Sequence, residues 1–337
     1  MKIIMLIYLA LIVFPWAIYP AILALFRKPT EPTYDIPTPN RWLILTAGRN
    51  VAERGVAHVH YLEQLCVEHG NAHAVYIDDR SDGAEAEDLT AWAELNKLEH
   101  VDILHGQYHA GKENALTGAL RYAGDGYTRV LFVDVGVRLW VGGEQDDILE
   151  GLDYDTYFRL PEVGGIAFSD DVEKPGLYLR LEMAIRNLES HAGGLVGAGG
   201  MGLAMKADAM PATFEAPCDL TMARVAMQKG FWIMHGGRDY QAVYTKPLNG
   251  AYQRAVRTAM RGMAGVEFVK GEHWWNFKLL CHKHLRWLSS ILIALNPVAW
   301  LLLIVRPSII RPHLAILHAA VLTLSGKRIT KWEGTKR

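Results

Sequence analysis

Four short apolar segments alternate with helical patterns between residues 41 and 136, and this alternation restricts the possible folds more than any other feature. Each segment is rich in aliphatic or aromatic residues, as expected of strands buried on both faces. Strand, helix, strand order predicts a mostly parallel, mixed sheet with right-handed crossovers, and hence an α/β fold. The predicted strands are RWLILTAGRN at 41–50, AHAVYIDDRSDG at 72–83, VDILHG at 101–106 and TRVLFVDVG at 128–136.

Helical spacing appears between and after these strands. The periodic segments predict helices within 50–70, 89–98, 109–124, 177–191 and 219–229. VGGIAFSD at 163–170 predicts an edge segment, and 193–206 is glycine-rich. No internal repeat or low-complexity segment interrupts this pattern.

The alternation resembles a nucleotide-binding domain, but the sequence has neither a GxGxxG turn nor a GxxxxGK[ST] loop. The chemistry is therefore sought in acidic residues at strand ends, where ligands bind in open α/β sheets. VLFVDVG at 130–136 ends in Asp134, whose desolvation is unfavourable without a cation, a donor or a substrate. The alternative interpretation is an aspartate that caps a helix or stabilises a turn.

Composition excludes some classes of protein. The chain has 337 residues, with 35 Lys and Arg against 36 Asp and Glu, and this balance argues against a nucleic-acid partner. Cys66, Cys218 and Cys281 show no CxxC spacing and are odd in number, so we expect neither a zinc ribbon nor a disulfide scaffold.

Both ends of the chain are membrane-like. Residues 3–26 carry no charge and are long enough to cross a bilayer, and the following Arg27 and Lys28 predict that the next segment is cytoplasmic. A cleaved signal peptide is the alternative, although the apolar run is long for one. Residues 288–305 form a second candidate span, and the apolar stretch 314–324 either completes a crossing or lies in the interface. We expect a multi-pass protein of the inner (plasma) membrane.

These features predict six regions. The sequence suggests an N-terminal transmembrane helix at 1–28, a proline-rich linker at 29–40, a catalytic domain at 41–270, an interfacial helix at 271–287, C-terminal membrane segments at 288–325 and a basic cytoplasmic tail at 326–337.

Four segments, taken in order, resemble motifs of one enzyme family. TAGRN at 46–50 stands where that family has its nucleotide-contacting first loop, and YIDDRSDG at 76–83 is similar to its DDGSxDG turn. HAGKENAL at 109–116 resembles its GKxxAL segment, and VDVG at 133–136 takes the place of its DxD. The family is the family 2 inverting glycosyltransferases with a GT-A fold, in particular the membrane-anchored polysaccharide synthases related to cellulose and hyaluronan synthases.

Three later segments extend the resemblance over most of residues 40–305. Residues 179–206 resemble the helix and glycine-rich loop that shape the sugar and acceptor pocket. PCDLTMARVAMQKGF at 217–231 is similar to the TED-type segment that carries the catalytic base, and CHKHLRW at 281–287 resembles the QxxRW-type motif.

The resemblance implies a role for each candidate residue. Asp219 would be the catalytic base, because an inverting transfer needs a group that accepts the proton of the acceptor hydroxyl. Asp134 would be the protein ligand of Mg²⁺ or Mn²⁺. The donor nucleotide would bind Ala47, Arg49, Asn50, Asp79, Lys112 and Asp134, and the acceptor or pyrophosphate would bind Gly199, Gly200, Arg286 and Trp287.

The sequence also departs from the family pattern. Gly136 replaces the second acid of DxD, Cys218 replaces the glutamate before the base, and Lys283 stands where QxxRW has glutamine. With Gly136 in this position, metal binding would depend on Asp134, the diphosphate and one other group.

Plain structural roles compete with the functional ones. Lys112 could be a solvated lysine at a helix start, and Asp219 could cap the helix that follows it. Arg286 and Trp287 could anchor the chain at a membrane interface. Glu182 and Glu189 share a helix face, and only the resemblance suggests that they belong to a pocket.

The leading hypothesis is an inverting membrane glycosyltransferase, of hexosyltransferase type, that transfers a sugar from a nucleotide-diphosphate sugar to a growing polysaccharide or a lipid-linked acceptor. An export path would need oligomers or a partner subunit. Two alternatives are a catalytically silent scaffold subunit of a synthase complex, suggested by the missing acids at 136 and 218, and a non-processive enzyme that glycosylates a polyprenyl phosphate.

Overall fold

The computed structural model describes residues 2–26, 40–51, 53–82, 85–107, 109–142, 148–155, 157–170, 176–199, 201–215, 217–244, 251–296 and 307–326. Internal contacts divide the chain into two compact units. The first comprises Met1–Thr30, Val172–Val196 and Gly250–Ile329, and the second comprises Glu31–Asp171, Gly197–Asn249 and Thr330–Arg337. This division differs from the predicted boundaries, since parts of the predicted 41–270 domain belong to the first unit.

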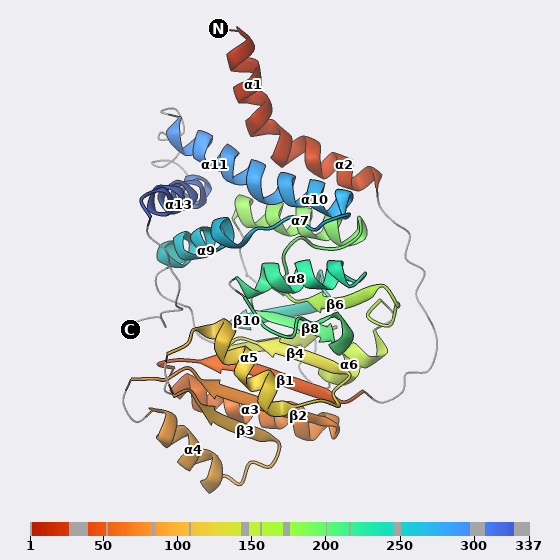
Figure 1. The fold of residues 1–337 in the computed structure, drawn as a ribbon, viewed down its shortest axis with the longest axis vertical. Helices are drawn as coiled ribbons and strands as arrows, with labels where there is room; N and C mark the ends of the chain where they lie inside the picture. Colours follow the sequence, from red (N-terminus) through yellow and green to blue (C-terminus); the bar gives the residue numbers. More distant parts are fainter. Residues whose placement is uncertain are drawn as a thin grey trace. The chain divides into compact units, whose positions relative to one another are not determined.

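The second unit is built on a seven-stranded sheet with the order β3-β2-β1-β4-β8-β6-β9 (Figure 1). β8 is antiparallel to β4 and β6, and the other pairs are parallel, which confirms the predicted mostly parallel mixed sheet. The strands are β1 (Trp42–Gly48), β2 (Ala72–Asp78), β3 (Val101–His105), β4 (Arg129–Val133), β6 (Val163–Ala167), β8 (Gly202–Lys206) and β9 (Trp232–His235).

The strand order reverses at β1. The chain runs outward from β1 through β2 to β3 and then returns to β4, which pairs with the other side of β1. The carboxyl ends of β1 and β4 therefore diverge into connections on opposite sides. Such a switch point is where ligands bind in open α/β sheets.

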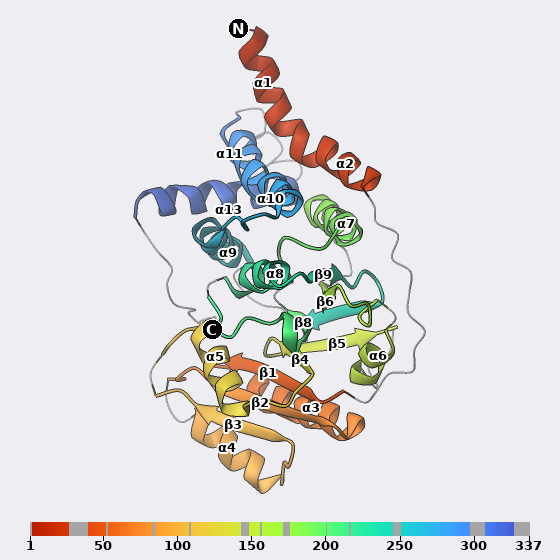
Figure 2. The same cartoon turned by 45° about the vertical axis from the view of Figure 1, so that its right-hand side comes forward.

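Helices cover both faces of this sheet, and α3 and α5 lie on opposite sides of β1 and β2 (Figure 2). Alternation along β1 matches the two layers, because Trp42 and Ile44 pack in the cluster that contains α3, whereas Leu45 lies beside Leu116 of α5. The helices of the second unit are α3 (Glu53–His69), α4 (Glu85–Leu95), α5 (Lys112–Ala123), α6 (Ile148–Tyr154), the short 3₁₀ helix η2 (Ala207–Ala209) and α8 (Cys218–Gln228).

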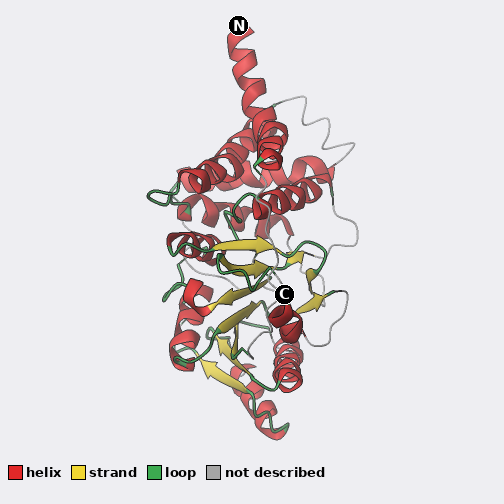
Figure 3. Ribbon diagram, turned by 90° about the vertical axis from the view of Figure 1, so that its right-hand side faces the viewer, coloured by secondary structure: helices red, strands yellow, loops and turns green. Residues whose placement is uncertain are grey.

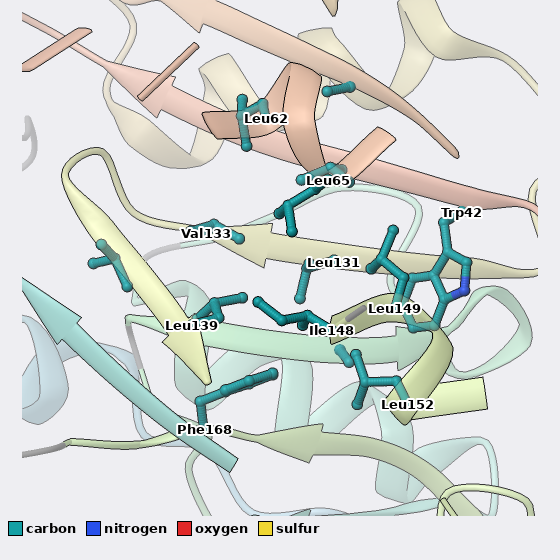
Figure 4. Close-up of a cluster of buried hydrophobic side chains, with 14 of the residues drawn as sticks. Trp42, Leu62, Leu65, Leu131, Val133, Leu139, Ile148, Leu149, Leu152 and Phe168 are labelled. Atoms are coloured by element: carbon teal, nitrogen blue, oxygen red, sulfur yellow. The ribbon is translucent and has the colours of Figure 1, made fainter. Parts of the chain in front are cut away.

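A smaller sheet packs on the α3 side of the main sheet. It has the order β5-β10-β7, formed by β5 (Val137–Val141), β10 (Tyr240–Tyr244) and β7 (Ser169–Asp170). Its side chains join a continuous apolar core with α3, α6 and the main sheet, in which Leu139 and Phe168 approach Ile148 (Figure 4). Burial of this core supplies the main stabilisation of the unit.

The predicted parallel strands are confirmed. Two features of the later sequence, the interior position of β6 and the strand β8, were not predicted. The edge prediction for VGGIAFSD is wrong for most of its length, because β6 lies between β8 and β9. The glycine-rich 193–206 segment ends in strand β8, where the glycines permit close contacts. A β-carbon on Gly202 would lie 2.8 Å from Leu139 and 3.2 Å from Phe168.

All elements described for the first unit are helices, which are red in Figure 3. One group packs α9 on α13 through Val256, Met260 and Ala319, and another packs α2 on α7 and η3. The elements are α1 (Lys2–Val13), the π-helix η1 (Phe14–Ile18), α2 (Tyr19–Leu25), α7 (Leu177–His191), α9 (Ala251–Gly265), α10 (His273–Leu279), the π-helix η3 (Leu280–Leu285), α11 (Arg286–Leu295) and α13 (Pro307–Leu324).

The segment Leu6–Leu25 is long and apolar enough to cross a membrane, the only such helix among the residues that the structure describes. It contains the π-turn at Phe14–Ile18, as expected near Pro15, which cannot donate a backbone hydrogen bond. Before this turn Leu6 and Leu9 are exposed, whereas after it Tyr19 and Leu23 are fully buried. Exposed apolar side chains also follow the turn, at Leu25 and Phe26, so Tyr19 and Leu23 anchor one side of a helix that is otherwise largely exposed.

The described residues do not support a multi-pass arrangement. The predicted span 288–305 begins in α11, but its second half, from residue 297, lies outside the described residues. The stretch 314–324 lies in an apolar helical segment, Ile310–Leu324, that is shorter than a full span. The proline-rich linker and the basic tail also lie outside the described residues, apart from Asn40 and Gly326.

Candidate active site at the switch point of the sheet

A pocket at the switch point collects five of the residues singled out in the sequence. It is lined by Ala47 near the end of β1, Lys112 at the start of α5, Asp134 just after β4, Gly199 before β8 and Asp219 in the first turn of α8. Cys218 lines it too. All of these residues belong to the second unit, so the sequence motifs meet within one compact body.

Asp134 is held by two neighbours in this pocket. Its Oδ1 forms an ion pair with the ammonium of Lys112, and its Oδ2 accepts a hydrogen bond of 3.2 Å from the Tyr244 hydroxyl. Burial by itself would lower the pKa of Lys112, but Asp134 outweighs this effect and holds that pKa above its ordinary value. Burial and Asp134 both raise the pKa of Tyr244, so its hydroxyl stays protonated and donates.

The turn after β4 explains why glycine follows Asp134 at position 136. Gly136 has a φ of 79°, a conformation that favours glycine, so a second acid in this position would be strained. Its N–H donates to Nδ1 of His58 at 3.4 Å. The departure from DxD is therefore part of the backbone geometry.

His58 links this turn to β1 through a continuous chain of hydrogen bonds. The Thr46 hydroxyl donates to the carbonyl of Val133 and accepts from His58 Nε2 at 3.0 Å, while Nδ1 accepts from Gly136. These bonds assign the proton of the neutral ring to Nε2. Burial, with a smaller contribution from Arg138, lowers the pKa of His58 to about 3. A neutral imidazole thus fixes the backbone on both sides of Asp134.

Asp219 presents a carboxylate to the pocket without capping α8. Pro217 occupies the N-cap position, and no side chain caps this helix. The carbonyl of Asp219 accepts from the N–H of Ala198 at 3.1 Å, which ties α8 to the glycine-rich segment. Its carboxylate makes no hydrogen bond or ion pair with any residue in the described ranges. The side chain is therefore available to a substrate.

Asp79 is buried beneath the start of α5. Its carboxylate accepts hydrogen bonds from His109 Nδ1 at 2.7 Å and from the N–H groups of Ala110 at 2.7 Å and Gly111 at 3.0 Å. With 1% of its surface exposed, Asp79 holds the loop that leads directly into Lys112. This loop-organising role was not predicted from the sequence.

The loop after β1 and the turn after β2 contact each other directly. Asn50 donates to the Asp82 carboxylate at 2.8 Å and accepts from the Asp82 N–H at 2.7 Å, and Arg49 pairs with Asp82 at 3.3 Å. The N–H of Asn50 also donates to Ser81 Oγ at 2.8 Å. The TAGRN loop and the DDRSD turn therefore form one cross-linked surface.

Arg286 and Trp287 belong to the first unit, not to the unit that contains the pocket. Arg286 is 3% exposed, pairs with Glu182 and lies 4.4 Å from the centre of the Trp16 ring. His282 bridges Glu182 at 3.0 Å and Glu189 at 2.7 Å.

Burial alone would raise the pKa of Glu182, but Arg286 and His282 hold it well below its ordinary value. Trp287 is partly buried against the α9 and α13 cluster, where its ring lies 3.0 Å from the position of a β-carbon on Gly262. Gly200 lies outside the described residues.

A preformed site for a divalent cation does not fit the residues of the pocket. Within the described ranges no three His, Cys, Asp or Glu side chains gather as ligands. Asp134 already binds a lysine ammonium, and Gly136 supplies no side-chain oxygen. Mg²⁺ needs nearly octahedral oxygen coordination, which this donor set lacks.

Comparison with solved structures identifies the fold. Mannosyltransferase PcManGT from Pyrobaculum calidifontis, solved in complex with GDP-Man and Mn²⁺, has a TM-score of 0.76 at 17% identity and covers 96% of this chain and 98% of that one. The chain has the GT-A fold.

Other similarities are weaker. Residues 1–349 of S. aureus TarS match with a TM-score of 0.40 and 11% identity over 86% of this chain and 93% of that one, too low to carry weight. The sequence matches no protein-family profile and no curated protein sequence.

Two residues that support the turn around Asp134, Tyr244 and His58, were missed in the sequence. Tyr244 ends a short strand whose sequence gives no sign of contact with Asp134. His58 carries a weak signal, because a histidine on the buried side of an amphipathic helix needs polar partners.

The neutral state of His58 predicts a pH-dependent stability. Since its pKa is about 3 when folded and about 6.5 when unfolded, its contribution is complete above the unfolded pKa and is lost as pH falls toward 3. The loss between pH 6.5 and pH 5 should be about 1.6 kcal/mol. In denaturant titrations of the detergent-solubilised chain, the stability difference between wild type and His58→Gln should shrink by this amount. A constant difference across the pH range would contradict the buried neutral imidazole.

The ion pair in the first unit predicts a stability defect. Glu182→Gln removes the carboxylate that pairs directly with the buried guanidinium of Arg286 and leaves only the more distant Glu189 to offset its charge. We expect the substitution to reduce stability by roughly 2 to 4 kcal/mol. Glu215→Gln is the matched control, since Glu215 pairs with Arg224 at 3.0 Å but is 67% exposed. Its effect should stay below about 1 kcal/mol in the same thermal unfolding assay. Equal effects of the two substitutions would show that Arg286 does not depend on Glu182.

Proposed function

We propose that this protein is a nucleotide-sugar-dependent glycosyltransferase. The supporting observation is the pocket at the switch point of a GT-A fold, where Lys112, Asp134 and Asp219 line one cavity. A cation suits the departure of a nucleoside diphosphate, and a carboxylate without a partner among the described residues suits the activation of a hydroxyl. PcManGT, which shares the fold, was solved with GDP-Man, and this supports a nucleotide-sugar donor.

In the proposed reaction, Asp219 accepts the proton of the acceptor hydroxyl. The oxygen then forms a bond to the anomeric carbon, while the bond from that carbon to the diphosphate oxygen breaks on the opposite face. The nucleoside diphosphate leaves with the electron pair, and the configuration of the anomeric carbon is inverted. Asp219 suits this role because its carboxylate lines the pocket and has no partner among the described residues.

The nucleoside would bind beside the linked TAGRN and DDRSD loops. Arg49 and Asn50 shape that surface, and Asp79 organises the loop before Lys112. In this proposal Asp79 contributes to nucleotide binding either by holding the loop before Lys112 in place or by accepting a hydrogen bond from the nucleotide itself. The acceptor roles of Gly200, Arg286 and Trp287 stay predictions from the resemblance.

The acceptor is proposed to be a polysaccharide or a lipid-linked saccharide at a membrane. The exposed apolar side chains of the N-terminal helix and the resemblance to polysaccharide synthases support this choice. A hexose donor is consistent with the same resemblance.

A donor screen tests the function. We expect the detergent-solubilised chain to release free nucleotide from at least one of a set of UDP- and GDP-sugars, because the pocket contains a candidate base and a phosphate-binding cation. Release is measured by a coupled nucleotide assay, with heat-denatured protein as control. If nucleoside diphosphates bind but no donor turns over with any saccharide or polyprenyl phosphate acceptor, the silent-scaffold hypothesis is favoured instead.

The base assignment gives a second prediction for the active donor. Asp219→Asn should reduce the transfer rate by roughly two to four orders of magnitude, because the amide keeps the shape but accepts no proton. Nucleotide affinity, measured by calorimetry, should stay close to that of wild type. Asp208→Asn, an exposed aspartate in η2, is the matched control and should transfer normally. Wild-type turnover in Asp219→Asn would rule out this base.

A further inference from the structure

We propose that Lys112 replaces the divalent cation in this pocket, receiving the diphosphate of the donor on its ammonium group while Asp134 and Tyr244 hold that group in position. This inference rests on the proposed function, since it concerns how the same pocket binds the donor. It differs from the sequence-based expectation that Asp134 binds Mg²⁺ or Mn²⁺.

The first argument is the state of the Asp134 carboxylate. Both of its oxygens have protein partners, Lys112 on Oδ1 and Tyr244 on Oδ2. A metal ion in this position would have to displace an ammonium and would repel it. The carboxylate thus already has a cation, supplied by the chain.

The second argument is that position 136 cannot restore the missing ligand. Gly136 has a φ of 79° and donates its N–H to His58, so the turn depends on a residue that tolerates this conformation. His58 is itself fixed by Thr46. The single-carboxylate arrangement is therefore built into the turn and its supports.

The third argument is the donor capacity of Lys112. A lysine ammonium has three N–H donors, and Asp134 uses one of them, which leaves two for phosphate oxygens. The side chain is 17% exposed and lines the pocket. In a site that is largely shielded from water, one fixed cation attracts a diphosphate far more strongly than it would in bulk solvent.

The fourth argument is that the lysine is held in place. Lys112 is the first residue of α5, and the preceding Ala110 and Gly111 are fixed by hydrogen bonds to Asp79. At the other end of the side chain, the carboxylate of Asp134 is oriented by Tyr244. Asp134 and Tyr244 are therefore positioning residues, and Lys112 is the group that touches the donor.

The test measures binding of GDP and UDP to the full chain by calorimetry, in EDTA and in Mn²⁺ or Mg²⁺. We expect the preferred nucleotide to bind with similar affinity in all three conditions. Lys112→Met should weaken that binding by roughly 10- to 100-fold, because a charge-assisted hydrogen bond is lost. The exposed Lys97 provides the matched control, and Lys97→Met should bind like wild type.

The Asp134→Asn substitution separates the two roles of the carboxylate. If Asp134 positions Lys112, this variant should weaken nucleotide binding to the same extent with EDTA and with Mn²⁺. If Asp134 is a metal ligand, binding should weaken only in the presence of the metal. The second pattern overturns the proposal.

Loss of the lysine could also affect folding, because Asp134 would lose its counter-ion. The double variant Lys112→Met with Asp134→Asn removes both charges and leaves none unpaired in the pocket. It should fold like wild type in a thermal unfolding assay and still show the affinity loss in EDTA. Retained affinity in this folded variant would overturn the proposal.

The outcomes distinguish this inference from the proposed function. Nucleotide binding that requires Mn²⁺ or Mg²⁺ overturns the lysine proposal and leaves the glycosyltransferase function intact. Failure of every nucleoside diphosphate to bind in any condition overturns both.

Discussion

The construction of the second unit depends on the burial of β1 between β2 and β4. Its aliphatic and aromatic residues face helices on both sides, so both faces are removed from water. Because β2 and β3 extend from one edge and β4 returns to the other, the carboxyl ends of β1 and β4 leave a space between their connections. The pocket lies there, and α5 and α8 bring Lys112 and Asp219 to it.

The backbone conformation of the turn after β4 restricts which side chains can stand next to Asp134. A glycine conformation at 136 and the neutral imidazole of His58 hold the chain on either side of Asp134. Because Gly136 stands where the DxD pattern has its second acid, this turn carries one carboxylate instead of two. A lysine beside the remaining carboxylate supplies a cation without a second acid, and in our proposal this ammonium receives the diphosphate.

Two ion pairs with low exposure illustrate different uses of similar chemistry. Lys112 and Asp134 line a pocket, and the ammonium keeps donors for a ligand. Arg286 and Glu182 lie among the helices of the first unit, with Trp16 over the guanidinium and His282 on the carboxylate. The second pair therefore ties the N-terminal helix to α7 and α11, in addition to any role suggested by the LRW sequence.

The sequence by itself determined the α/β class, the first four parallel strands and the apolar N-terminal helix, and it pointed to five of the residues that line the pocket. These features depend on local patterns, since apolar strands and acids at strand ends are recognisable along the chain. Only the tertiary structure decided the interior place of β6, the strand in the glycine-rich segment and the contacts of Tyr244 and His58. These depend on pairing between residues far apart in the chain, as when Tyr244 meets Asp134 across 110 positions. The pairing of Asp134 with Lys112 could likewise be seen only in the tertiary structure. The sequence around an aspartate looks the same whether its carboxylate binds a metal ion or a lysine ammonium.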